Sequence, residues 1–141
     1  MIRTIDETIS VAPQIRPEDL ADLAASGFTA IINNRPDGED DGQPTGDTIA
    51  SAAAAAGLRY TAIPVTHAGF SGAQVEAMAA ALDAAGGPVL AYCRSGTRSC
   101  NLWALAAASQ GGDPDMLTAK AAGAGYDLSG IRALLDTLSG R

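Results

Sequence analysis

The chain has 141 residues, a length typical of one domain, here 1–141, whose hydrophobic core needs neither a metal ion nor a disulfide bond for stability. Hydrophobic residues make up 47% of the chain and charged residues 18%, which indicates a globular rather than a disordered protein. The formal net charge is −7, and a nucleic-acid-binding face needs the opposite sign, so we expect no nucleic-acid partner. We interpret the acidic stretch 37–41 as a solvated loop.

The cysteine and hydropathy patterns predict a cytoplasmic protein with reduced thiols. A disulfide between Cys93 and Cys100 would distort a loop placed at a strand end. The N-terminus has no apolar core of signal-peptide length, and no run approaches the ~18 apolar residues of a membrane span, so we expect no membrane partner. One histidine and two cysteines give no zinc-ligand pattern, and we expect no metal ion and no other cofactor.

In chain order, the first half of the sequence predicts two strands and two helices. Residues 8–11 are typical of a short strand, which we place at a sheet edge because of its brevity and the proline that follows. A proline and two acids in the first turn predict a helix over 17–27, and the apolar run 28–33 predicts a buried parallel strand. Residues 34–46 are rich in Gly, Pro and acid and predict a loop, followed by a helix to about residue 56.

The second half continues the alternation of strands and helices. It predicts a strand over 58–65, a loop over 66–71 and a helix over 72–85. A buried strand over 89–92 and a helix over about 98–109 come next, and further helices follow over about 113–139. This order predicts an α/β fold, a three-layer sandwich with a mostly parallel four- to five-stranded sheet flanked by helices.

The run CRSGTRS at positions 93–99 carries the clearest chemical signal. A strand, a loop and a helix N-terminus form an anion cradle, because the loop amides and the helix dipole point at one spot. Gly96 permits the unusual backbone angles of such a loop. The amides together with Arg94 and Arg98 favour thiolate over thiol at Cys93, the candidate nucleophile. A cysteine after a buried strand is ordinarily an inert small hydrophobic residue, but two arginines so close together indicate an anion site.

Three loops leave strand ends that should face the same edge of the sheet, namely 33–41, 65–71 and 93–98. The carboxyl ends of parallel strands build the site in such sheets, so we expect all three loops to converge above Cys93. The loop amides and a guanidinium would hold the equatorial oxygens of a tetrahedral oxyanion. The expected oxyanion-binding residues are Arg94, Ser95, Gly96, Thr97 and Arg98.

The run at 93–99 resembles the active loop shared by cysteine-dependent phosphatases and rhodanese sulfurtransferases. Together with IINNRPDGE at 31–39 and IPV at 63–65, it resembles the phosphatase-like domain of the bacterial beta-lactamase hydrolase-like proteins. That family is related in fold to dual-specificity phosphatases and is often associated with sulfur metabolism, so the resemblance implies a cysteine-phosphatase-like fold. It covers about residues 2–110, and the C-terminal helices lie beyond it.

The resemblance also implies roles and partners. Ser99 would donate a hydrogen bond to the Cys93 sulfur and ease its departure, although from the residues alone it is equally a hydroxyl at a helix N-terminus. Arg94 would point outward to recruit anions or be a solvated surface residue. Cys100 is expected to pack in a buried helix, with resolution of an oxidised Cys93 as the alternative. The implied partners are a small anionic substrate (a sulfane-sulfur donor or a phosphoester) and a metallo-hydrolase or persulfide-handling protein.

Loop length and a missing acid separate the two activities. Dual-specificity and tyrosine phosphatases usually place one residue more between Cys and Arg, whereas four residues separate Cys93 from Arg98, as in rhodaneses. Those phosphatases also carry an aspartate in the loop after the Ile-Pro-Val strand, because a poor leaving group must be protonated. The corresponding loop 66–71 contains no carboxylate.

Three side chains are candidates for the missing general acid. His67 is the only histidine and lies in the loop after the Ile-Pro-Val strand. Asp37 or Glu39 could reach over from the neighbouring strand end, and we favour Asp37, because a role as a turn residue is the stronger reading of Glu39. Arg35 would add positive charge at the rim or pair with the acidic run.

The sequence therefore favours a cysteine-dependent group-transfer enzyme, a rhodanese-type sulfurtransferase that carries a persulfide on Cys93. The first alternative is a protein-tyrosine or dual-specificity-like phosphatase, a hydrolase that forms a phosphoenzyme on Cys93. The second alternative is a non-catalytic oxyanion-binding module, which needs Arg98 and the loop amides but no thiolate.

Overall fold

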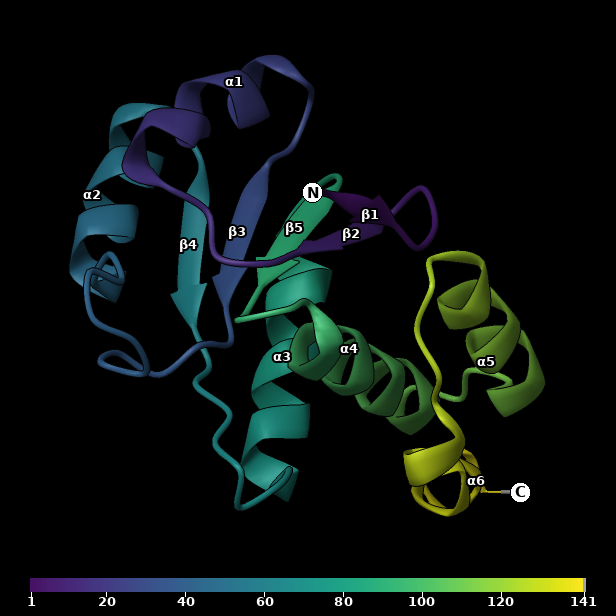
Figure 1. Cartoon of the computed structure of the whole chain (residues 1–141). Coiled ribbons are helices and arrows are strands. Elements are labelled where there is room, and N and C mark those ends of the chain that lie inside the picture. Colours follow the sequence, from purple (N-terminus) through teal and green to yellow (C-terminus); the bar gives the residue numbers. More distant parts are fainter. Residues whose placement is uncertain (141) are drawn as a thin grey trace.

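The computed structural model describes residues 1–140 and contains a five-stranded sheet covered by helices on both faces (Figure 1). The strands are β1 (Arg3–Thr4), β2 (Ile9–Ala12), β3 (Ala30–Asn33), β4 (Arg59–Ala62) and β5 (Val89–Tyr92). They lie in the order β1-β2-β5-β3-β4, and all neighbouring pairs are parallel except β1 with β2. The predicted α/β fold with a mostly parallel sheet is confirmed.

The helical elements follow the predicted order. They are η1 (Pro17–Asp19), α1 (Leu20–Ala25), α2 (Gly46–Ala55), α3 (Gly72–Ala84), α4 (Thr97–Ser109), α5 (Pro114–Gly123), η2 (Ser129–Ile131) and α6 (Arg132–Ser139). No helix within residues 1–140 is long and apolar enough to cross a membrane.

The sheet separates two hydrophobic cores because successive side chains of each strand point to opposite faces. Ile31 and Leu90, paired in register on β3 and β5, pack in the core that α1 and α2 cover. Ile32 and Ala91, the next pair, pack in the larger core that α3, α4, α5 and α6 cover. Both faces of the central strands are therefore buried, which explains why these strands are continuous apolar runs in the sequence.

β2 is an inner strand, and the prediction that it forms a sheet edge was wrong. β1 pairs with it on the outside, with Arg3 opposite Val11. The turn between them is held by Asp6, whose Oδ1 accepts hydrogen bonds from the backbone N–H and the hydroxyl of Thr8 at 2.8 and 2.6 Å. A two-residue strand is too short to show an alternating pattern, so the sequence gives no sign of β1.

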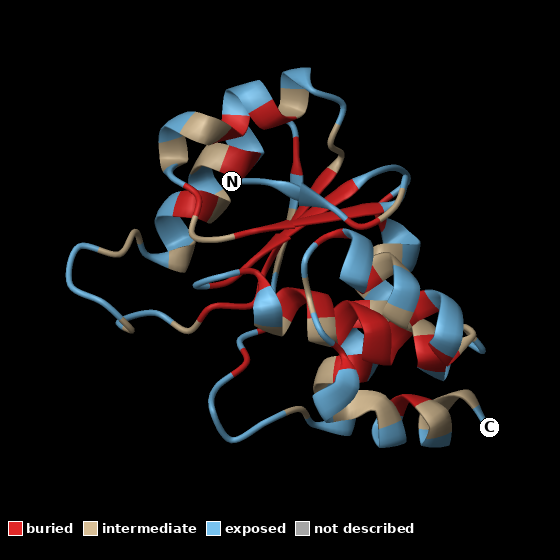
Figure 2. Cartoon of the chain, turned by 45° about the vertical axis from the view of Figure 1, so that its right-hand side comes forward, coloured by how far each residue is buried: buried red, intermediate tan, exposed pale blue. Residues whose placement is uncertain are grey.

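α4 is the central helix of the larger core and is buried along most of its length (Figure 2). Its apolar residues on several sides, among them Leu102, Trp103 and Leu105, contact neighbours all round the helix, which is typical of a core helix. Leu102 and Trp103 both lie in the larger core. Because the helix is fixed by this packing, its N-terminus lies rigidly beside the end of β5.

We expect Leu105→Ala to lower the free energy of unfolding by about 2–5 kcal/mol, because the fully buried side chain leaves a cavity in the core. Urea denaturation monitored by circular dichroism measures this change. Leu134→Ala is the matched control, since Leu134 on α6 is 42% exposed and its truncation should cost less than about 1 kcal/mol. Equal losses in the two variants would contradict a central role for α4.

Candidate active site

The carboxyl ends of three parallel strands meet at one edge of the sheet and begin the loops of the site. Cys93 follows β5, Asn34 follows β3, and Val65 lies shortly after β4. The backbone N–H of Asn34 donates to the carbonyl of Tyr92 at 2.8 Å, and the N–H of Val65 donates to the carbonyl of Asn34 at 3.0 Å. The predicted convergence of strand-end loops near Cys93 is confirmed at these positions.

The Cys93 sulfur is buried at the base of the loop between β5 and α4. Its Sγ accepts a hydrogen bond from the backbone N–H of Gly96 at 3.1 Å. Gly96 has a φ of +90°, a left-handed conformation that favours glycine, as the sequence predicted. α4 begins at the next residue, so the positive end of its dipole lies beside the same loop. The Gly96 N–H and the N-terminus of α4 therefore both direct partial positive charge at the Cys93 sulfur.

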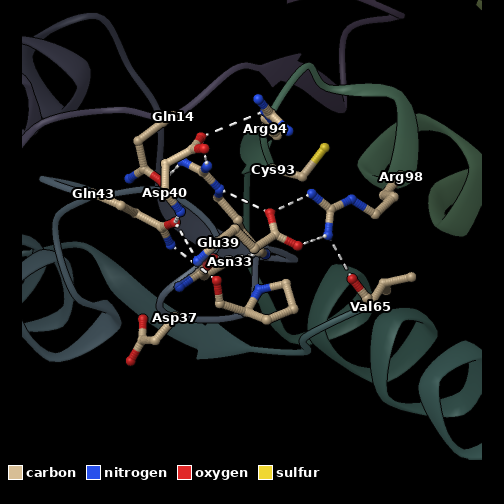
Figure 3. A network of polar contacts seen from close by, with 12 residues as sticks. Gln14, Asn33, Asp37, Glu39, Asp40, Gln43, Val65, Cys93, Arg94 and Arg98 are labelled. Atoms are coloured by element: carbon tan, nitrogen blue, oxygen red, sulfur yellow. Dashed lines mark hydrogen bonds and ion pairs between the residues drawn. The ribbon is translucent and has the colours of Figure 1, made fainter. Parts of the chain in front are cut away.

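Arg98 is held beside Cys93 by three hydrogen bonds (Figure 3). Its Nη1 and Nη2 donate to the two carboxylate oxygens of Glu39, both at 2.7 Å, and Nη1 also donates to the carbonyl of Val65 at 2.7 Å. A guanidinium has five N–H groups in a fixed planar arrangement. Three are used here, which leaves Nε–H and one Nη2–H on one edge for the Cys93 sulfur and for an oxyanion beside it.

Arg35 holds the other side of the same carboxylate and is itself buried, with only 4% of its side chain exposed. Its Nε donates to Glu39 at 3.0 Å, its Nη2 to Asp40 at 2.6 Å and its Nη1 to Gln14 at 3.1 Å. The interpretation of stretch 37–41 as a solvated loop was therefore wrong at Glu39, whose side chain is only 18% exposed, whereas the paired Asp40 is 47% exposed. A buried guanidinium needs charged or polar acceptors, and the acidic stretch supplies them.

Glu39 is the carboxylate that both arginines share, and the hydrogen bonds from Arg98, with those from Arg35, hold its pKa at about 2, well below its usual value. The same pairing with Glu39 raises the pKa of Arg98, with a smaller contribution from the Cys93 sulfur. Glu39 is therefore ionised near neutral pH and cannot serve there as a general acid. Its function in the site is to accept hydrogen bonds from Arg98.

Asp37 lies away from Cys93, on the opposite side of the network (Figure 3). Its Oδ1 accepts a hydrogen bond at 2.8 Å from the backbone N–H of Gly46, the first residue of α2, and so satisfies a free donor of that helix. The prediction that favoured Asp37 over Glu39 as the side chain reaching the site was wrong. His67 lies exposed in the loop between β4 and α3, and its catalytic role stays a prediction.

Ser99 does not make the hydrogen bond that the resemblance implied. Its hydroxyl is fully buried in α4 and has no hydrogen-bond partner within the described residues, while the Cys93 sulfur accepts from Gly96 instead. Arg94 points outward as predicted, with 66% of its side chain exposed and its Nε 3.5 Å from an Asp40 carboxylate oxygen. Arg94 therefore lies as expected, and Ser99 fits the alternative reading, a hydroxyl in the first turn of a helix.

Ser95 and Thr97 form the exposed side of the loop. The Ser95 hydroxyl donates to the Thr97 hydroxyl at 3.0 Å and accepts from the Thr97 backbone N–H at 3.4 Å. Their side chains therefore bind each other at the exposed side of the loop.

Cys100 packs in the larger core, as predicted, and both cysteines are free thiols. Burial raises the pKa of Cys100 to about 12, with a smaller contribution from Cys93, so this thiol is protonated and unreactive near neutral pH. Within residues 1–140 no group of three or more His, Cys, Asp or Glu side chains is arranged to hold a metal ion.

We expect Glu39→Gln to lower the free energy of unfolding at pH 7 by about 2 kcal/mol, because two mostly buried guanidinium groups lose a charged acceptor. Glu39 has a lowered pKa in the folded state, so its contribution is present above its ordinary value of 4.5 and is lost as the pH falls through about 2. Urea denaturation at several pH values should show the difference from wild type shrinking across this window. Glu76→Gln, at an exposed position on α3, is the control, and its free energy of unfolding should differ little from wild type at any pH. A loss of stability in Glu39→Gln that does not change with pH would contradict the ion-pair role of Glu39.

We expect Asp37→Ala to lower the free energy of unfolding by about 1 kcal/mol, because the first N–H group of α2 loses its acceptor. Asp41→Ala, an exposed acid of the same loop, should change stability by less than about 0.5 kcal/mol. Thermal unfolding of the two variants measures the contrast. Equal stabilities would show that the contact with α2 contributes nothing.

The sequence is similar to one named group of bacterial proteins. Residues 1–110 match the family model of the beta-lactamase hydrolase-like protein, phosphatase-like domain. The beta-lactamase hydrolase-like protein of Agrobacterium fabrum is 42% identical over 107 residues, which cover 76% of this chain and 25% of that protein. Its namesake from Xylella fastidiosa is 38% identical over 101 residues, which cover 72% and 23%. The chain spans about a quarter of the length of these curated relatives.

Solved structures resemble nearly the whole chain. A candidate phosphatase from Neisseria meningitidis has a TM-score of 0.82 at 35% identity and covers 97% of both chains. A second candidate phosphatase, from Shewanella putrefaciens, has a TM-score of 0.75 at 26% identity and covers 99% of this chain and 88% of its own. TpbA of P. aeruginosa, solved in complex with pTyr, shares the fold with a TM-score of 0.65 at 20% identity, over 98% of this chain and 87% of its own. With the geometry at Cys93, these similarities support a cysteine-based enzyme, and the chain belongs to the family of phosphatase-like domains of the beta-lactamase hydrolase-like proteins.

Proposed function

We propose that the chain is a cysteine-dependent phosphatase that hydrolyses phosphate monoesters through a phosphocysteine on Cys93. The observation that carries the proposal is the Arg98 guanidinium, fixed beside the buried sulfur by Glu39 and Val65 with one edge left for an oxyanion. The proposal replaces the sulfurtransferase favoured from the sequence. Whole-chain similarity to two candidate phosphatases supports this change.

The chemistry would run in two steps. In the first, the Cys93 thiolate attacks phosphorus, an S–P bond forms, the P–O bond to the leaving group breaks, and the leaving oxygen takes the electron pair. The loop amides and the free edge of Arg98 would hold the non-bridging oxygens, where negative charge gathers. In the second step, water attacks phosphorus and the S–P bond breaks. Inorganic phosphate departs with the oxygen and both protons of the water, the sulfur keeps the electron pair, and the thiolate is restored.

The two carboxylates considered as general acids restrict which leaving groups the site can release. Glu39 is ionised, and Asp37 is engaged at α2, so neither is placed to protonate a departing alkoxide. Aryl phosphates release a phenolate, which leaves as an anion far more readily than an alkoxide does. We therefore expect aryl esters, phosphotyrosine among them, to be cleaved much faster than alkyl esters such as phosphoserine.

Sulfur transfer is the second candidate, and the short loop between Cys93 and Arg98 favours it. Here the thiolate would attack the sulfane sulfur of thiosulfate, the S–S bond would break, and sulfite would leave with the electron pair. The Cys93 persulfide would then pass its outer sulfur to a nucleophile such as cyanide. This reaction needs no general acid, because sulfite leaves as a stable anion.

A paired assay on wild type, Cys93→Ser and the control Cys100→Ser separates the candidates. One arm supplies a series of aryl phosphates of graded leaving-group acidity, with phosphoserine, across pH 5 to 8. The other arm supplies thiosulfate with cyanide. We expect phosphate release to fall at least 10³-fold in Cys93→Ser, to persist in Cys100→Ser, and to rise steeply with leaving-group acidity.

Two results would overturn the phosphatase proposal. Thiocyanate formation that depends on Cys93, with a sulfur adduct of about 32 Da on the intact protein, would establish sulfurtransferase chemistry if no phosphate is released. Silence in both arms, with sulfate still binding in calorimetry, would leave a non-catalytic oxyanion-binding module.

A further inference from the structure

One peptide group in the loop between β5 and α4 makes a hydrogen bond on each of its two sides. The Ser95–Gly96 peptide donates through the Gly96 N–H to the Cys93 sulfur at 3.1 Å. The carbonyl oxygen of the same peptide, on Ser95, accepts a hydrogen bond from the hydroxyl of Tyr126 at 3.1 Å. Tyr126 lies between α5 and η2, in the part of the chain beyond residues 1–110 that match the family model.

The geometry of the peptide couples these two hydrogen bonds. The structure contains no cis peptide bond in the described residues, and in a trans peptide the C=O and the N–H point in opposite directions from one rigid plane. A contact that fixes the direction of the Ser95 carbonyl therefore fixes the direction of the Gly96 N–H. If the plane turned over, the carbonyl oxygen would face the sulfur and disfavour the thiolate.

The fit around Tyr126 is close and is maintained by a second contact. A Cβ atom at position 96 would lie 2.3 Å from the Tyr126 hydroxyl, so the tyrosine packs directly against the bare glycine backbone. On the other side, the Arg3 guanidinium lies 5.9 Å from the centre of the Tyr126 ring and donates to the carbonyl of Ala124 at 3.2 Å. Burial raises the pKa of Tyr126, so its hydroxyl is protonated and available as a donor.

We propose that Tyr126 is a positioning residue of the active site, which holds the Ser95–Gly96 peptide in the orientation that directs the Gly96 N–H at the Cys93 sulfur. The inference rests on the proposed function only in taking Cys93 as the nucleophile. Its consequence is that the C-terminal segment sets the reactivity of a thiolate that lies within the family-matched part of the chain.

The test is the pH dependence of Cys93 alkylation by iodoacetamide in full-length Tyr126→Phe, a variant that loses only the hydroxyl. Both thiols are buried, and peptide mass spectrometry distinguishes alkylation at Cys93 from alkylation at Cys100. Without the hydroxyl, the Ser95–Gly96 peptide can turn and its N–H no longer points at the sulfur. We expect the midpoint of the alkylation profile to move up by about one pH unit, because the loss of one hydrogen bond to the thiolate lowers the thiolate population roughly tenfold. Tyr60→Phe is the matched control, because it also removes one tyrosine hydroxyl, here the one that accepts a hydrogen bond from Asn33. Its alkylation midpoint should match that of wild type.

A second measurement and a second variant test the same orientation of the Ser95–Gly96 peptide. The Gly96 amide proton shift in NMR spectra should follow the titration of Cys93 in wild type and lose that response in Tyr126→Phe. If Tyr126→Phe fails to fold, Arg3→Gln loosens the ring without touching the loop and should move the alkylation midpoint in the same direction by less. An unchanged midpoint in the folded variant would overturn the proposal.

Alkylation needs no substrate, so this experiment fails separately from the phosphatase assay. A shifted midpoint in a protein that releases no phosphate would uphold Tyr126 as a positioning residue and contradict the phosphatase function. Phosphate release together with an alkylation midpoint that is the same in wild type and Tyr126→Phe would support the phosphatase function and contradict a positioning role for Tyr126.

Discussion

The site depends on one carboxylate that neutralises two mostly buried guanidinium groups. Neither Arg35 nor Arg98 can lose its proton in a protein, so burying them requires acceptors nearby. Glu39 serves both, with both of its oxygens bonded to Arg98 and one of them shared with Arg35. The shared carboxylate holds the loop after β3 against the helix after β5, and with the Val65 carbonyl it fixes the plane in which Arg98 can meet an anion.

The same neutralisation changes what stabilises the nucleophile. The positive charge of Arg98 is largely balanced by Glu39, so its field at the Cys93 sulfur is weaker than that of a free guanidinium. The stabilisation of a thiolate then depends more on local dipoles, namely the N-terminus of α4 and the Gly96 N–H. A dipole acts through its direction, which makes the orientation of a single peptide group important to the chemistry.

The sequence predicted what is local and missed what depends on distant partners. The strand, loop and helix around Cys93 follow from adjacent residues, and the left-handed Gly96 follows from the type of loop. The choice between Asp37 and Glu39 does not, because it depends on which carboxylate reaches a guanidinium 59 residues further along the chain. The resemblance predicted a hydrogen bond from Ser99 to the Cys93 sulfur, and the backbone N–H of Gly96 makes that hydrogen bond instead. β1 has only two residues, too few to show a pattern in the sequence.

The supports of the loop come from opposite ends of the chain, and this affects how far a motif can be carried between relatives. Glu39 reaches Arg98 from within the family-matched residues, whereas Tyr126 reaches the Ser95 carbonyl from beyond them and is braced by Arg3 at the N-terminus. Two domains with the same CRSGTRS run could therefore hold the Gly96 N–H in different orientations if their C-terminal segments differ. The motif identifies the nucleophile. The reactivity of its sulfur depends on the fold of the whole domain, because Tyr126, which orients the Ser95–Gly96 peptide, lies outside the motif.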